Sequence, residues 1–142
     1  MKSIRTLFGI LLVTLVLVSC GGGGGGGGGG GSAPAASNSL IGTWIADDGT
    51  ETMEWTFDNT NLTIKDYINS TLDSHAIVPY TVSGNVFSFN VHDGTVVYGG
   101  SSTGINRVVS FEYSVSGNNL TVTNCKYDGV LHSSDTVIFT RR

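Results

Sequence analysis

The chain has 142 residues, of which 21 are glycine, and eleven of those glycines form one run from Gly21 to Gly31. Charged side chains make up 13 % of the chain, about half the usual share, and the formal net charge is −4. This acidic balance excludes nucleic acid as a partner. The part that follows the glycine run, residues 40–142, is long enough to bury the core of one domain.

The first nineteen residues have the features of a signal peptide. Lys2 and Arg5 supply a positive start, and residues 7–18 form an apolar stretch that only Gly9 and Thr14 interrupt. A twelve-residue stretch is too short to span a bilayer but suits a cleaved leader. We therefore expect residues 1–19 to be removed on export.

The leader ends in Leu17-Val18-Ser19-Cys20, which resembles the bacterial lipobox. The resemblance implies that Cys20 receives diacylglycerol and becomes the first residue after cleavage, so that acyl chains such as palmitate anchor the protein to the membrane. Gly21 and Gly22 lack the acidic residue that retains enterobacterial lipoproteins in the inner membrane, which implies delivery to the outer membrane of the cell envelope. An ordinary leader that happens to contain a cysteine is the alternative.

Residues 20–39 form a tether between this anchor and the domain. The glycine run and the Ser-Ala-Pro-rich segment after it hold almost no apolar surface to bury, so we expect flexible coil with a root-mean-square reach of about 25 Å. Loss of Lys2 and Arg5 leaves five basic side chains against eleven acidic ones, a net charge near −6. An acidic domain is held off an anionic lipid surface rather than drawn to it.

Residues 40–142 have the composition of a β domain. Valine, isoleucine, threonine and aromatic residues number 45 there, against 16 for the residues that favour helices most. Period-two alternation is explicit in Met53, Trp55 and Phe57 and recurs along the chain. Turn residues at 58–61, 83–85 and 116–119 separate pairs of alternating runs and indicate hairpins.

The alternation and the turns predict an all-β fold of about eight antiparallel strands. We place the strands near residues 41–46, 51–58, 61–68, 75–83, 85–92, 106–116, 119–126 and 134–141. Consecutive hairpins favour an up-and-down β-barrel, and a β-sandwich is the alternative. Pro79 belongs near a strand edge or a bulge, and residues 93–105, rich in glycine, form the longest loop.

Three segments of this domain resemble the small bacterial lipocalin-like domains found in lipoproteins. They are Leu40-Ile41-Gly42-Thr43-Trp44 at the start, Phe57-Asp58-Asn59, and Phe139-Thr140-Arg141 at the end. The resemblance covers residues 40–142 and implies that Trp44, after Gly42, lies across the closed end of the barrel with Arg141 packed on its ring. The domain is shorter than a full lipocalin, which argues against a large cavity.

Two functions from different classes fit this barrel. In the first, the open end binds a small apolar or amphipathic ligand, and the candidate lining residues are Trp55, Phe57, Phe87, Phe89, Phe111 and Tyr113. In the second, these side chains and Phe139 fill the barrel completely, and the outer surface serves as a protein-interaction or inhibitor module of the cell envelope.

We find no pattern of catalytic or metal-binding residues. His75, His92 and His132 lie far apart in the sequence, and no nucleophile motif is present. We therefore expect no enzyme activity, no cofactor and no metal. With Cys20 lipidated, Cys125 has no partner within the chain, and we expect it to be a buried free thiol on a strand.

Overall fold

The computed structural model describes residues 39–92, 96–98 and 106–142. The signal peptide, Cys20 and all of the tether except Ser39 lie outside the described residues, as does the predicted loop at 93–105 apart from residues 96–98. Among the described residues there is no helix that could cross a membrane.

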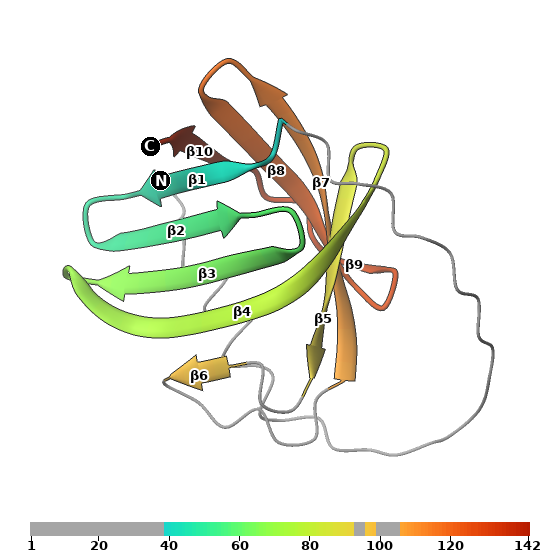
Figure 1. The fold of residues 1–142 in the computed structure, drawn as a ribbon, viewed down its shortest axis with the longest axis horizontal. Helices are drawn as coiled ribbons and strands as arrows, with labels where there is room; N and C mark the ends of the chain where they lie inside the picture. Colours follow the sequence, from blue (N-terminus) through green and yellow to red (C-terminus); the bar gives the residue numbers. More distant parts are fainter. Residues whose placement is uncertain (1–38, 93–95, 99–105) are drawn as a thin grey trace.

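The described residues form a sheet of ten strands, all in antiparallel pairs (Figure 1). In chain order they are β1 (Gly42–Asp47), β2 (Glu51–Phe57), β3 (Asn61–Ile68), β4 (Thr71–Ser83), β5 (Val86–His92), β6 (Val96–Tyr98), β7 (Asn106–Ser116), β8 (Asn119–Tyr127), β9 (Val130–Ser133) and β10 (Val137–Arg141). Eight of these strands close into an up-and-down barrel, whereas β6 and β9 lie outside the closed ring.

Strand β10 closes the ring because it pairs on both sides. Its Arg141 lies opposite Trp44 of β1, and its Val137 lies opposite Val122 of β8. From β1 round to β8, each strand of the ring pairs with the next one along the chain, except that β5 pairs with β7 because β6 lies outside the ring. The fold is therefore the predicted antiparallel up-and-down β-barrel and not the β-sandwich.

Two strands were absent from the sequence prediction. Residues 96–98, predicted as loop, form β6, which pairs with the first half of β4 at His75 and Ala76. Val130–Ser133 forms β9, which pairs with the second half of β8. Both strands are too short for period-two alternation to be recognised. Strand β4 also begins earlier than predicted, at Thr71.

Pro79 lies within β4, opposite Asn61 of β3. On the other edge, β4 pairs with β6 at residues 75–76 and with β5 only from Tyr80 onward. No described residue pairs with Pro79 on that edge, because β4 changes there from pairing with β6 to pairing with β5. The N–H group that proline lacks is therefore not needed for a bond on this edge. A proline costs little at such a place because no ladder bond is lost.

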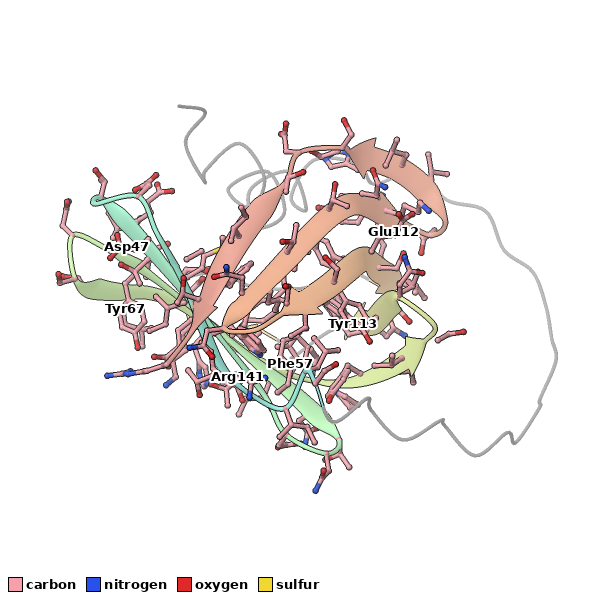
Figure 2. The ribbon with its side chains drawn as sticks, turned by 90° about the horizontal axis from the view of Figure 1, so that it is seen from above. Asp47, Phe57, Tyr67, Glu112, Tyr113 and Arg141 are labelled. Atoms are coloured by element: carbon pink, nitrogen blue, oxygen red, sulfur yellow. The ribbon has the colours of Figure 1, made fainter. Side chains whose placement is uncertain are left out.

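Alternation along the strands separates a packed interior from a polar exterior. The described core contains aromatic and aliphatic side chains from all eight ring strands. In Figure 2 Phe57 and Tyr113, from different walls, point toward the middle of the barrel. A bulge in β8 against β7, where Asn124 has φ 53°, shifts the alternation so that Cys125 and Tyr127 also face the core.

Candidate functional site

The centre of the barrel is an aromatic cluster around Trp55. The ring centroid of Trp55 lies 4.6 Å from that of Phe139, 5.7 Å from Phe111 and 5.8 Å from Phe87. Most of these contacts are edge-to-face, the geometry that aromatic pairs prefer. Side chains from β2, β5, β7 and β10 thus meet on the barrel axis.

The six candidate ligand-binding residues all belong to this cluster or touch it. Phe57 contacts Phe87 at 5.4 Å, and Phe87 contacts Tyr113 at 5.9 Å. Phe89 stacks on Phe111 at 6.3 Å. All six side chains are between 0 and 9 % exposed. The structure therefore brings the candidates together, and they occupy the space between them with their own rings.

The closed end of the barrel is held by Trp44 and Arg141. The guanidinium carbon of Arg141 lies 4.4 Å from the centroid of the Trp44 ring. Trp44 Nε1 donates a 2.7 Å hydrogen bond to the carbonyl of Leu40, and Arg141 Nη2 donates one of 2.7 Å to the carbonyl of Ser39. Through these hydrogen bonds the two side chains hold Ser39 and Leu40, the residues that lead into β1, at the closed end of the barrel.

The backbone conformation at Gly42 favours glycine. Its φ is 135°, which a residue with a Cβ rarely adopts, whereas a Cβ there would make only an ordinary contact, 3.6 Å from Arg141 Nη1. Gly42, Trp44 and Arg141 therefore form one structural unit that closes the barrel.

Toward the open end lies a partly buried carboxyl group, that of Asp66. Asp66 follows Leu62 and Ile64 on the inner face of β3 and lies opposite Ser74 of β4. Ser74 Oγ donates a 2.7 Å hydrogen bond to Asp66 Oδ2, whereas the buried Asp66 Oδ1 accepts none. Burial raises the pKa of Asp66, and the nearby negative charge of Asp73 raises it further.

A second polar group lies at the open end, on β8. Tyr127 is buried, its hydroxyl group makes no hydrogen bond, and burial strongly raises its pKa. The ring of His132 from β9 packs on it at 4.6 Å between centroids. Cys125, two residues earlier, is a buried free thiol as predicted, and burial raises its pKa to about 11.

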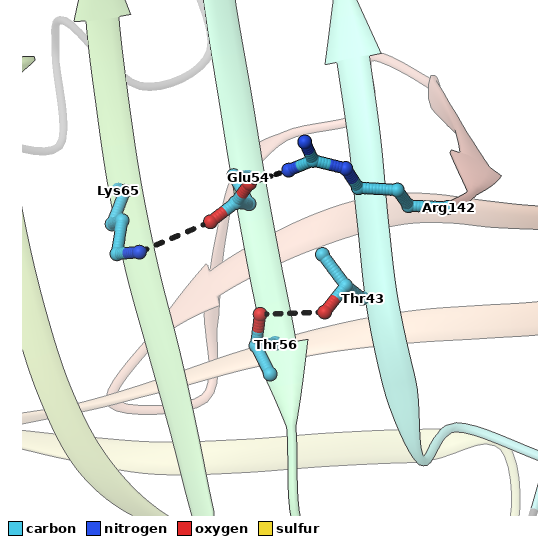
Figure 3. A network of polar contacts seen from close by, with 5 residues as sticks. All are labelled: Thr43, Glu54, Thr56, Lys65 and Arg142. Carbon is cyan, nitrogen blue, oxygen red and sulfur yellow. Dashed lines mark hydrogen bonds and ion pairs between the residues drawn. The ribbon is translucent and has the colours of Figure 1, made fainter.

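Ion pairs and hydroxyl contacts cover the outer wall of β1, β2 and β3 (Figure 3). Glu54 accepts hydrogen bonds from Lys65 at 3.1 Å and from Arg142 at 3.0 Å. Thr43 and Thr56 share a hydrogen bond of 3.0 Å. These side-chain contacts link the strands to one another, and each of the three charged side chains named here has a partner of opposite charge.

The structure describes the side chains of two of the three histidines, and they come from different strands. His75 lies on β4 and His132 on β9, and the side chain of His92 lies outside the described part. Within the described ranges no three histidine, cysteine or carboxylate side chains are grouped as a metal site would need.

Sequence reasoning missed Asp66 and the hairpin formed by β8 and β9. The signal for Asp66 was available, because a carboxylate at the third inward position after Leu62 and Ile64 breaks the apolar pattern. The signal for the hairpin was the pair Asp128-Gly129, which favours a two-residue turn.

Comparisons with known proteins give no relative from which a function could be transferred. No family model matches the chain, and no curated protein and no solved structure matches it. The function is therefore argued from the side chains described above.

Proposed function

We propose that this protein is a lipid-anchored, non-enzymatic interaction module of the cell envelope, and that it acts through the outer surface of a solidly packed barrel. The observation that carries the proposal is the aromatic cluster on the barrel axis. Trp55, Phe87, Phe111 and Phe139 are each at most 1 % exposed, and the ring of Trp55 contacts the other three.

A filled interior favours this proposal over ligand binding because a ligand needs room. Pockets for small molecules usually enclose several hundred Å³. The inward side chains of the described strands cover one another closely. Even the small side chains among them, those of Ala46, Val109 and Cys125, are at most 3 % exposed. A molecule entering between them would have to displace aromatic rings from close-packed contacts, which is costly.

The outer surface offers apolar side chains that are exposed in the described part of the chain. Six large apolar residues are exposed on the described strands, namely Leu72, Ile77, Val108, Val130, Leu131 and Ile138. To test the proposal, a photoreactive residue is placed at each of these positions in living cells. Crosslinks from at least one position to another protein support the proposal, and their absence at all six contradicts it.

The anchor is part of the proposal and rests on the lipobox-like residues that end at Cys20. Cys20→Ala is expected to leave the leader unprocessed and to abolish labelling with a palmitate analogue. Label that persists in this variant contradicts lipidation at Cys20. Density-gradient fractionation tests the location, since the residues after Cys20 favour the outer membrane.

Ligand binding is the second candidate, and the open end favours it. Asp66 Oδ1 and the Tyr127 hydroxyl are buried without hydrogen bonds, and the polar head of an amphipathic molecule could supply the missing partners. Native mass spectrometry of protein purified from its own membrane tests this. Co-purifying lipid that is lost in Asp66→Leu, a variant without the acceptor, would favour the ligand-binding function.

A further inference from the structure

We infer that the free edge of β9 is the docking site, and that its partner is an extended basic segment that adds to the sheet as a further strand. This inference rests on the proposed function, because it names the surface and the kind of partner through which the interaction module acts.

The first observation is that β9 lies outside the closed ring. The first half of β8 pairs with β10, which continues the ring to β1, while residues 125–127 of β8 pair with β9. Among the described residues β9 has no second neighbour, and Figure 1 shows its hairpin projecting beside the barrel. Closure removes the edges of the eight ring strands, so β9 keeps an edge that they lack.

The second observation is that this edge is held rigidly. Asp128 and Gly129 form a two-residue turn with φ 50° and 81°, the values of a type I′ hairpin. The hairpin is tied to β7 because the Asp128 N–H donates to the Val108 carbonyl at 2.8 Å and the Val108 N–H donates to Asp128 Oδ1 at 2.9 Å. A rigid edge loses little conformational freedom when a strand is added.

The register determines which groups the edge presents. Tyr127 and Val130 close the two-residue turn and lie opposite each other, followed by Lys126 and Leu131. In an antiparallel ladder hydrogen-bonded and non-hydrogen-bonded pairs alternate, so the N–H and C=O of Leu131 point away from β8. These are the groups with which an added strand pairs in β-augmentation.

The side chains of β9 favour pairing with a partner. The strand contains no lysine and no proline, residues that commonly protect edges, and its bulge comes after Leu131, beyond the two residues that present the edge. Val130 and Leu131 are 71 % and 53 % exposed and can pack against alternate side chains of an added strand. Two cations lie near this hairpin: Lys126 is already paired with Glu112 at 3.1 Å, and Arg107 of β7 is close enough to Tyr127 to act on its pKa.

The charge around the edge indicates the chemistry of the partner. Asp128 stands at the exposed turn before β9 and Asp135 follows it, and the domain as a whole is acidic. A partner strand flanked by lysine or arginine complements this surface, whereas a second copy of the acidic domain is repelled.

The test uses the full-length mature protein in detergent micelles and a peptide of alternating valine and threonine with two lysines at each end. We expect binding that protects the Leu131 amide from hydrogen exchange. A peptide with glutamates at its ends, or with a central proline, is expected to bind at least about tenfold more weakly.

Leu131→Lys is the test variant, and Ile77→Lys is its control because Ile77 is similarly exposed at 51 % but belongs to a strand of the closed ring, where it lies opposite Thr63 of β3. Leu131→Lys is expected to weaken binding of the lysine-flanked peptide at least about tenfold, and Ile77→Lys by no more than about twofold. Equal affinities of the two variants, or no protection of the Leu131 amide, overturn the inference.

Two further outcomes separate this inference from the function on which it rests. A dimer in sedimentation that Leu131→Lys abolishes shows that a second copy occupies the edge, and this overturns the assignment of a basic partner. Crosslinks in cells from Ile77 or Leu72 but not from Val130 or Leu131 overturn the β9 site and leave the interaction module standing. Absence of crosslinks at every position contradicts both.

Discussion

The guanidinium group of Arg141 lies over the indole ring of Trp44, with 4.4 Å between the guanidinium carbon and the ring centroid. The two residues lie opposite each other on β10 and β1, the pair of strands that completes the ring. One contact therefore joins the two ends of the domain and closes one end of the barrel. The chain that enters from the tether is fixed to the same place through Ser39 and Leu40.

Arg141→Ala is expected to lower the free energy of unfolding by about 1 to 2 kcal/mol, because it removes the cation–π contact and the packing of the aliphatic stem. Trp44→Ala is expected to cost more, since the whole indole ring is buried. Denaturant unfolding of both single variants and the double variant measures their coupling. Losses that simply add would show that the contact contributes nothing.

Arg142→Ala is the matched control at the neighbouring position. Arg142 reaches Glu54 at 3.0 Å, but its side chain is 71 % exposed. Exposed ion pairs contribute little, so its loss is expected to cost no more than about 1 kcal/mol and to disappear at high salt. A larger loss at Arg142 than at Arg141 would contradict the assignment of roles.

Phe111→Ala is expected to cost about 3 to 5 kcal/mol of unfolding free energy, because it leaves a cavity in the middle of the aromatic cluster. Ser114→Ala, on the exposed outer face of the same strand, is expected to change it by no more than about 0.5 kcal/mol. Equal effects at the two positions in a denaturant titration would mean that β7 is rotated from the described register.

The closed barrel was predictable from sequence because its signals are local and repeated. Met53, Trp55 and Phe57 alternate with polar residues, and each hairpin turn contains glycine, asparagine or aspartate. These features determine which side of each strand is buried and which strands are neighbours. They do not determine how far the aromatic rings fill the interior, since that depends on the tilt of the strands and on rotamers.

The features at the open end were only partly predictable, because the signals of Asp66 and of Asp128-Gly129 do not by themselves determine which residues face the core. The inward position of Cys125 and Tyr127 depends on the bulge of β8 against β7 at Asn124, where a positive φ in a non-glycine residue shifts the alternation. A bulge changes the alternation without a composition signal of its own. The burial of Asp66 likewise depends on Ser74, a residue from the next strand.

Cys125 is expected to be nearly inert toward alkylation in the folded protein. Burial raises the pKa of its thiol from 9.0 to about 11, which lowers the thiolate fraction at pH 8 by about a hundredfold, and the side chain is 2 % exposed. Mass spectrometry after treatment with iodoacetamide measures the reaction. Labelling at the rate of the urea-unfolded chain would contradict the described burial.

Asp66 is expected to make the stability of the barrel depend on pH. Burial and the charge of Asp73 raise its pKa in the folded protein above the ordinary value of 3.8. The folded state therefore binds the proton more tightly than the unfolded state, and the contribution of Asp66 is fully present below the ordinary pKa. It is lost as pH rises through the raised folded pKa. Acidification toward pH 4 should stabilise the wild-type protein relative to Asp66→Asn.

The measurement is the difference in unfolding free energy between wild type and Asp66→Asn from pH 4 to pH 7.5. This difference should fall as pH rises, with a slope of at most about 1.4 kcal/mol per pH unit. Glu112→Gln is the control of opposite sign and is followed further, to about pH 2.5, because hydrogen bonds from Asn124 and Lys126 lower the pKa of Glu112 and its contribution is lost only below the ordinary value of 4.5. If Asp66 gives a pH-independent difference, or one with the sign expected of Glu112, its carboxyl group is solvated and the open end of the barrel is wet rather than packed.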